Sequence, residues 1–193
     1  ECWKSVSMDL IFGFPAESLG RTGVLVFVDR LSKMVHLAAV TSKVTAEQSA
    51  SLFMESVFKN HGMPTDLVSD RDPRFTAAFW QELFRLVGTS LSMSTADHPE
   101  TDGQTERANR VIGTMLRSFS LSHPKDWSEQ LPMVEFAMNN AVHASTGYTP
   151  FYMNNLRHPR IPALLTPRGG APSLGGGGIR EDVSHPIDAE HLT

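Results

Sequence analysis

The sequence predicts a mixed α/β domain in which helices pack on a β-sheet. The first 40 residues hold three strand patterns in close succession, and amphipathic patterns with helical spacing follow them. Strand patterns lie at 5–12, 24–28, 34–40, 65–69 and 89–94. Helical patterns lie at 45–61, 76–87, about 102–122 and about 127–142. The resulting order, β-β-β-α-β-α-β-α-α, is typical of a sheet with helices packed on it.

The first three strands should form an antiparallel meander. Residues 5–12 alternate between two faces, one with Val6, Met8 and Leu10 and the other with Ser7, Asp9 and Ile11. Residues 24–28 are continuously apolar, which is typical of a strand buried on both faces. Residues 34–40 follow after a short turn at 29–33. Three strands this close together predict a meander.

The helical patterns at 45–61 and 76–87 each carry one apolar face. In the first pattern the apolar residues recur three and four positions apart, at Ala46, Ala50, Phe53, Met54, Val57 and Phe58. In the second they are Phe79, Trp80, Leu83, Phe84 and Val87. Gly62 with Pro64 should end the first helix, and Gly88 the second, because neither residue type continues a helix well.

The helix at about 102–122 has a polar face opposite an apolar one. Thr101 and Gln104 can form the capping box that begins it. The helical period places Ala108, Val111, Ile112, Met115 and Phe119 on the core side, and Glu106, Arg110, Gly113 and Arg117 on the other. Glu106 therefore points away from the core, toward solvent or a site. A capping box of Asp126 and Glu129 is expected to begin the last helix.

Composition changes after about residue 165. We expect residues 1–165 to form one domain and 166–193 to form a disordered tail, because the tail is rich in Gly and poor in large apolar residues. The chain starts at Glu1 without a Met or a signal peptide, so we expect it to be a piece of a longer protein. No apolar run reaches the roughly 18 residues of a membrane span, so no membrane partner is expected.

Charge and cysteine content narrow the class of function. A net charge of −4 argues against a generic polyanion binder. It allows a nucleic-acid enzyme that keeps acids in its site and bases beside it. Cys2 is the single cysteine, which rules out an internal disulfide and favours an intracellular setting. The eight His lack zinc-site spacing, so we interpret them as structural or surface residues.

Three acids are candidates for chemistry. Asp9 lies within an apolar strand, where a lone carboxylate is costly unless a positive partner or a metal compensates it. Asp70 comes where a short strand ends, and sites on α/β sheets are commonly built at strand ends. Glu106 lies on the polar face of the long helix.

Spacing alone leaves simpler interpretations open. Glu106 and Arg110 could be an i,i+4 surface pair, worth roughly 0.3–0.5 kcal/mol. Asp70 and Asp72 could be turn residues, and Asp29 could shape a hairpin. The three candidate acids lie on separate elements, so their spacing does not by itself identify a reaction.

An ordered series of motifs resembles a known family. These motifs are SMDLI at 7–11, VDRLSK at 28–33, HGMP at 61–64, VSDRDPRF at 68–75, HPETDGQTERANR at 98–110, EFAMNN at 135–140 and STGYTPF at 145–151. Over about residues 3–160 the chain resembles the integrase catalytic core of gypsy-type LTR retrotransposons. The resemblance implies an RNase H-like fold, with a mixed five-stranded sheet and helices packed on both faces.

The resemblance also implies a catalytic triad. Its two Asp and one Glu are carried over to Asp9, Asp70 and Glu106, which would be both the catalytic and the metal-binding residues. Thirty-five residues lie between Asp70 and Glu106, as the family signature leads one to expect, so Asp70 is preferred to Asp72. Two Mg²⁺ or Mn²⁺ ions would be the cofactors, because three acids with open coordination positions suit hard divalent ions.

The implied activity is that of a polynucleotidyl transferase, which processes the 3′ ends of element DNA and joins them to target DNA. His98, Gln104, Asn109 and Arg110 are the expected DNA contacts, with Arg suited to phosphate. The expected partners are DNA, further copies of the chain and other domains of a pol polyprotein. The nucleus is the expected place of action.

Two other functions stay open. The first is a nuclease of the same fold that only hydrolyses DNA strands. The second is a catalytically silent or host-adopted remnant that binds DNA or a partner. The complete set of acids favours the enzymes. The absence of recognisable flanking zinc-binding and C-terminal modules within these residues keeps the remnant open.

Overall fold

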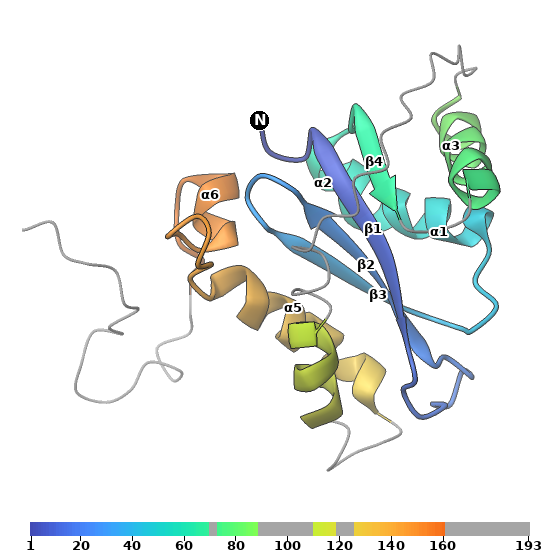
Figure 1. Ribbon diagram of the computed structural model, residues 1–193, viewed down its shortest axis with the longest axis horizontal. Helices are drawn as coiled ribbons and strands as arrows, with labels where there is room; N and C mark the ends of the chain where they lie inside the picture. The colour runs from blue at the N-terminus through green and yellow to red at the C-terminus, as the bar shows by residue number, and fades with distance from the viewer. Residues whose placement is uncertain (70–72, 89–109, 119–125, 161–193) are drawn as a thin grey trace, which may run out of the picture. The chain divides into compact units, whose positions relative to one another are not determined.

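Figure 1 shows the computed structural model of the chain, which describes residues 1–69, 73–88, 110–118 and 126–160. Residues Glu1–Arg160 form one compact unit. This unit is a mixed sheet with helices, so the predicted α/β class is confirmed. The predicted domain boundary near 165 and the predicted tail lie outside the described residues and stay predictions.

The sheet is mixed, as predicted. Its strands are β1 (Ser5–Phe12), β2 (Gly23–Asp29), β3 (Val35–Val40) and β4 (Asp66–Ser69). They lie in the order β3-β2-β1-β4, with β1, β2 and β3 antiparallel and β4 parallel to β1. The predicted meander is therefore confirmed. The segment 89–94, predicted as a fifth strand, lies outside the described residues.

The helical segment predicted at 45–61 is present but is not uniform. It consists of α1 (Ala46–Phe53), a π-helical turn η1 (Met54–Phe58) and α2 (Lys59–His61). Thr45 and Gln48 form a reciprocal capping box at its start. Gly62 ends it with a φ of 83°, a backbone conformation that favours glycine.

The other helices differ in detail from the sequence patterns. They are α3 (Pro73–Val87), an α-helical segment at 110–118, a 3₁₀ turn η2 (Trp127–Gln130), α5 (Leu131–Asn140) and α6 (Pro150–Asn155). Helix α6 was not predicted, although Thr149 caps it and Pro150 opens it, which is a recognisable start signal. Among the described helices, none combines the length and apolarity that crossing a bilayer needs.

The predicted capping box of Asp126 and Glu129 is wrong. Asp126 makes no side-chain cap, and the N–H of Glu129 donates instead to the backbone carbonyl of Asp126 at 3.0 Å. The chain forms a 3₁₀ turn here and continues as α5, with Pro132 in the first turn of that helix. Pro is tolerated there because its missing N–H would have had no partner within the helix.

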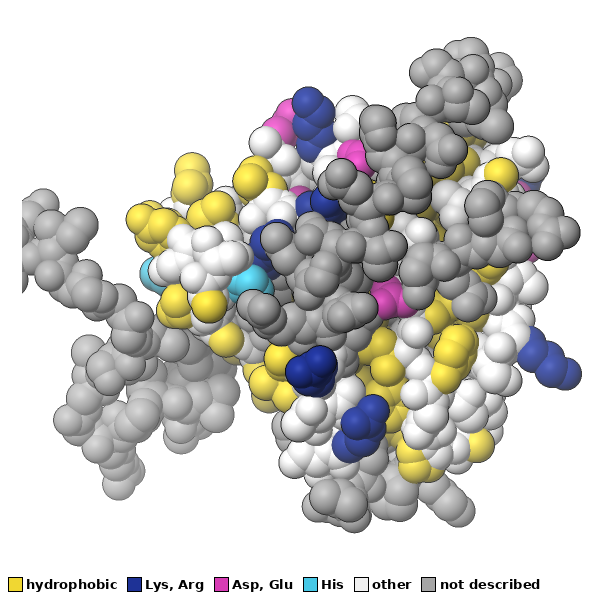
Figure 2. Space-filling model, in the orientation of Figure 1, with side chains coloured by type: hydrophobic (Ala, Val, Ile, Leu, Met, Phe, Trp, Pro, Cys, Tyr) yellow, Lys and Arg dark blue, Asp and Glu magenta, His cyan; other side chains and the backbone are white. Residues whose placement is uncertain are grey.

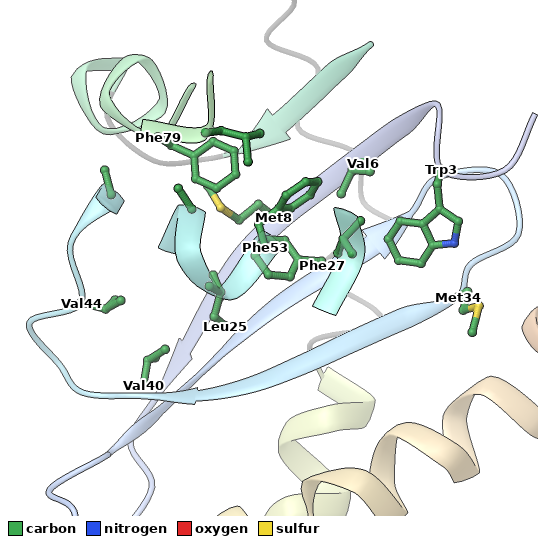
Figure 3. Packing of buried hydrophobic residues seen from close by; sticks show 14 residues of the cluster. Trp3, Val6, Met8, Leu25, Phe27, Met34, Val40, Val44, Phe53 and Phe79 are labelled. Carbon is green, nitrogen blue, oxygen red and sulfur yellow. The ribbon is translucent and has the colours of Figure 1, made fainter. Parts of the chain in front are cut away.

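Helices cover both faces of the sheet, as predicted, and each face has its own core. One core, which Figure 3 shows, joins the sheet to α1 and α3, with Phe53 packed edge-on against Phe27 and Phe79. The other joins the sheet to 110–118, η2 and α5 through Ile112, Leu116, Trp127, Leu131 and Val134. All residues of β2 are buried, which confirms the prediction for its continuous apolar run.

The buried face of 110–118 is rotated from the predicted one. Ile112 and Leu116 are fully buried, and Met115 packs beside them. Val111, predicted on the core side, is 42% exposed, and Gly113, predicted on the polar side, is buried. The contact is centred between Ile112 and Leu116, which places Val111 outside the contact. Arg110 and Arg117 are exposed, as predicted for the polar face.

Candidate active site

Asp9 lies in the interior of β1 and points toward the face of the sheet that carries 110–118. It stands directly across from Val26 of β2, and opposite residues in an antiparallel pair point to the same face. Val26 belongs to the core that 110–118 and α5 cover. Asp9 itself is only half-buried, and its Oδ1 accepts a hydrogen bond from the Leu10 N–H at 2.7 Å. A carboxylate here has both a fixed backbone contact and access to solvent.

The parallel strand β4 leads the chain to a point beside Asp9. Ser5 pairs with Asp66 and Met8 pairs with Ser69, so β4 runs alongside β1 in the same direction. Ser69 is the last described residue before the gap at 70–72, and Asp70 is the next residue in the sequence. The last described pair of β1 and β4 is therefore Met8 with Ser69, one position before Asp9.

The remaining predicted site residues are mostly outside the described part of the chain. The structure describes Asp9 and Arg110, but not Asp70, Glu106, His98, Gln104 or Asn109. Arg110 is exposed at the first described residue of 110–118, and its backbone carbonyl accepts a hydrogen bond from the Thr114 hydroxyl at 2.8 Å. The predicted triad and its DNA contacts thus stay predictions.

Asp29 has the hairpin role that the sequence suggested. It is fully buried at the end of β2. Its carboxylate accepts hydrogen bonds from the Trp3 N–H and the Ser32 N–H, both at 2.9 Å, and from the Ser32 hydroxyl. These donors hold the turn between β2 and β3 in place. A fully buried carboxylate that accepts these hydrogen bonds is a poor metal ligand, whereas the Asp9 carboxylate is only half-buried.

A second polar cluster, the histidine network, was not foreseen. His36 Nδ1 lies 2.9 Å from Oε1 of Glu135, and His36 Nε2 lies 3.0 Å from Nε2 of His61. Trp3 stacks on both imidazole rings, with centroid distances of 5.0 and 4.3 Å. The Nδ1–H of His36 can donate to the Glu135 carboxylate, and one hydrogen bond joins Nε2 of His36 to Nε2 of His61. These contacts are structural, as was expected of the histidines.

Helix α5, which carries Glu135, also packs along the outer edge of β3. The Leu37 N–H donates to Oε2 of Glu135 at 2.9 Å. The Val35 N–H donates to Oδ1 of Asn139 at 2.8 Å, and Asn139 Nδ2 donates back to the Val35 carbonyl at 2.9 Å. Side chains four residues apart on α5 thereby satisfy backbone groups that an edge strand would leave unpaired. Their i,i+4 spacing within EFAMNN was the available sequence signal.

The donor set available at Asp9 fits a hard divalent cation. Mg²⁺ takes carboxylate oxygens together with water and phosphate oxygens, and Asp9 offers a partly accessible carboxylate on a rigid strand. Within the described ranges, no three His, Cys, Asp or Glu residues gather in a way that could hold a metal ion. Two of the three predicted ligands, Asp70 and Glu106, lie outside those ranges.

Relatives of the chain are transposon polyproteins. The Tf2-3 and Tf2-4 polyproteins of Schizosaccharomyces pombe are each 36% identical to it over 165 residues, which is 86% of this chain. The chain spans only 12% of the length of each polyprotein. No protein-family model matches the chain.

Solved structures with the same architecture include a retroviral integrase core and a chain of a retroviral intasome. The HTLV-2 integrase catalytic core domain in complex with magnesium has a TM-score of 0.56 and 20% identity, covering 77% of this chain and 94% of that one. The chain has the fold of an integrase catalytic core. A chain of the simian T-cell lymphotropic virus intasome, solved in complex with PP2A regulatory subunit B56 gamma, gives a TM-score of 0.60 at 18% identity. The match covers 83% of this chain and 56% of that one.

These comparisons confirm the resemblance drawn from the motifs. The sequence match to retrotransposon polyproteins extends over most of the chain, and the integrase-core fold agrees with it. The predicted RNase H-like class is thereby confirmed. The identity to the solved cores is too low to transfer roles to individual residues, so those roles rest on the motifs and on the described geometry.

Proposed function

We propose that the chain is the catalytic core of a retrotransposon integrase, a metal-dependent polynucleotidyl transferase that processes element DNA ends and joins them to target DNA. The observation that carries the proposal is the parallel pairing of β1 and β4. It brings Asp9 and the chain position just before Asp70 next to each other at one edge of the described sheet. A continued register would put Asp70 across from Asp9.

Asp9, Asp70 and Glu106 would hold the metal ions. When bound, two such ions activate the attacking oxygen and stabilise the leaving oxygen of an in-line displacement at phosphorus. The chain supplies the placement: β1 fixes Asp9 through its hydrogen bonds to neighbouring strands. Glu106 precedes Arg110 by four residues, about one helical turn, so a continued helix would align the acid with the base.

Arg110, with His98, Gln104 and Asn109, would bind and orient the DNA beside these acids. Arg is suited to phosphate because its planar guanidinium donates two parallel hydrogen bonds. Figure 2 shows an acidic side chain over β1 and basic side chains over 110–118 on one face of the molecule. This arrangement reconciles DNA binding with an acidic chain, since the bases lie beside the acids that would carry metal. The joining step would take place in the nucleus.

Further copies of the chain are the expected protein partners. The HTLV-2 core is described in trimeric and dimeric forms, and the simian relative belongs to an intasome. The Tf2 relatives are polyproteins, so other domains of such a polyprotein would flank this chain. DNA ends and target DNA complete the proposed assembly.

A thermal shift tests the metal site. Mg²⁺ or Mn²⁺ at ten times its Kd should stabilise the native chain by about 1.4 kcal/mol, because a ligand that binds only the folded state shifts the equilibrium. That corresponds to a rise in Tm of roughly 3–6 °C. Asp9→Asn should remove most of this rise, because the amide keeps the shape but loses the charge that attracts the cation.

The matched control is Asp126→Asn, which makes the same change at an exposed position outside the predicted triad. This variant should keep the full rise in Tm. An equal rise in the native chain and in Asp9→Asn would show that the metal binds elsewhere, and the proposal would lose its site.

A further inference from the structure

We propose that Arg117 is a second DNA-phosphate contact, and that Gly113 is the position that lets the Arg117 side chain lie along the helix toward Arg110. The inference rests on the proposed function, because it needs DNA on this face. It adds a residue that the motif 98–110 does not contain. It also gives a role to Gly113, where the polar face of the helix otherwise lacks a side chain.

The contact between Arg117 and Gly113 is the starting point. A Cβ built at Gly113 would lie 3.3 Å from Nη2 and 3.7 Å from Cζ of Arg117. Apart from the two adjacent residues and the nearby backbone of its own helix, it would meet no other described atom within 4 Å. The guanidinium group therefore covers Gly113, which explains why a residue on the polar side of the helix is buried. Helical side chains lean toward the N-terminus, so a residue four positions later is the one that reaches it.

The direction of this lean brings two cations together. Arg110 and Arg117 are seven residues apart, which is about two helical turns or roughly 10 Å along the axis. Because Arg117 lies back over Gly113, its guanidinium moves about one turn toward Arg110. The result is a basic pair on one stripe of the helix. Each strand of duplex DNA carries a negative charge about every 3.4 Å along the helix axis, so one backbone can meet both cations.

The charges around the pair favour an outside anion. Among the described residues, no carboxylate pairs with Arg110 or Arg117. Arg21 differs, because its Nε lies 2.6 Å from Oε1 of Glu17, and so does Arg85, which pairs with Glu82 on α3. Arg110 and Arg117 carry like charges, and a phosphate backbone would relieve the repulsion between them.

Arg110 and Arg117 also lie on the face of the sheet toward which Asp9 points. Arg110 and Arg117 are both exposed, and Arg117 lies beside the buried Gly113 at the margin of the helix's buried face. Figure 2 shows basic side chains in the region of this helix, on the same face as an acidic side chain over β1. A DNA strand that places a phosphate near Asp9 would therefore pass this helix. Arg85 lies on α3, which covers the other face of the sheet, and offers a matched control.

The test measures how salt affects DNA binding by the 193-residue chain. A fluorescently labelled duplex is titrated at several NaCl concentrations, and log K is plotted against log salt concentration. Arg117→Ala should reduce the steepness of that line by about one unit, because each phosphate contact contributes about 0.9. Arg117→Lys should largely keep the slope, since the charge remains. Arg85→Ala removes the same charge from the other face and should leave the slope unchanged.

Gly113→Leu separates the position of the guanidinium from its charge. The leucine side chain takes the space over residue 113 and pushes Arg117 away, without changing the net charge. We expect the same loss of slope as in Arg117→Ala. The helix should remain folded, because leucine favours helix more than glycine does. Circular dichroism and the Tm verify that the variant is folded.

The outcomes distinguish this inference from the proposed function. If Arg117→Ala leaves the slope unchanged, or if Arg85→Ala lowers it equally, Arg117 is not a specific contact and the inference is wrong. If only Arg110→Ala lowers the slope, the inference fails while the proposed function stands. A native chain without salt-dependent DNA binding would defeat both. If Gly113→Leu had the same slope of log K against log salt concentration as the native chain, the role assigned to Gly113 would be wrong.

Discussion

Glu106→Gln is expected to abolish DNA joining while preserving DNA binding. The amide keeps the shape of the side chain but loses the charge that would hold a metal ion. Mutating even a residue that only supports a metal ligand typically costs 10–100-fold, so the loss of a ligand should exceed about 100-fold. The assay joins an oligonucleotide with the element's terminal sequence to target DNA in Mn²⁺, using the chain with its flanking polyprotein domains restored.

The isolated chain should retain at most weak disintegration, the reversal of joining, because that reaction needs the acids and a preassembled DNA more than long-range recognition of DNA ends. Glu106→Gln should remove this activity as well. Glu129→Gln is the matched control, since it makes the same change at an exposed residue of η2. If the native protein and Glu106→Gln were equally inactive on every terminal sequence yet both bound DNA or a protein partner, the remnant interpretation would replace the enzyme.

Stability should fall on acidification between pH 7 and pH 5 because of His61. Burial, followed by the nearby His36, lowers the pKa of His61 from 6.5 to about 4, while Asp29 partly opposes this shift. Below about pH 6.5 the unfolded chain therefore binds a proton at His61, whereas the folded chain does not bind it until about pH 4. The contribution of His61 to the free energy of unfolding is therefore highest above pH 6.5 and decreases toward pH 4. At pH 5 the decrease from the value at pH 7 is on the order of 1–2 kcal/mol.

Urea unfolding at pH 7 and pH 5 measures this loss. His61→Phe keeps a ring against Trp3 but cannot titrate, so its stability should depend less on pH, even though it is lower at pH 7. His158→Gln changes an exposed histidine and should behave like the native chain. A native chain and a His61→Phe variant with equal losses on acidification would show that the histidine network does not control this range of pH.

Local patterns were enough to predict much of the fold. The alternation in β1, the continuous apolar run of β2 and the helix stop at Gly62 act over a few residues, so their consequences can be derived from the sequence. The hairpin role of Asp29 is also local, because its donors include Ser32, three residues away. The family resemblance came from ordered motifs, and the fold comparison agrees with it.

Contacts between distant segments were not predictable in this way. Asn139 and Val35 are 104 residues apart, and Glu135 and His36 are 99 apart, so no local period relates them. The rotation of 110–118, which exposes Val111 and buries Gly113, is set by how the helix meets the sheet and by the return of Arg117 over Gly113. The candidate site has the same character, because its three acids come from separate parts of the chain.

The central claim is that Asp9, Asp70 and Glu106 share a metal site, and anomalous scattering from a crystal of the chain soaked in Mn²⁺ tests it most directly. We predict a manganese peak within about 2.2 Å of a carboxylate oxygen of Asp9, at a bond length slightly above that of Mg²⁺. The carboxylates of Asp70 and Glu106 should complete the site, while Asp29 and Asp72 stay outside it. A manganese peak held by other residues, with ordered Asp9 and Asp70 carboxylates far apart, would contradict the triad.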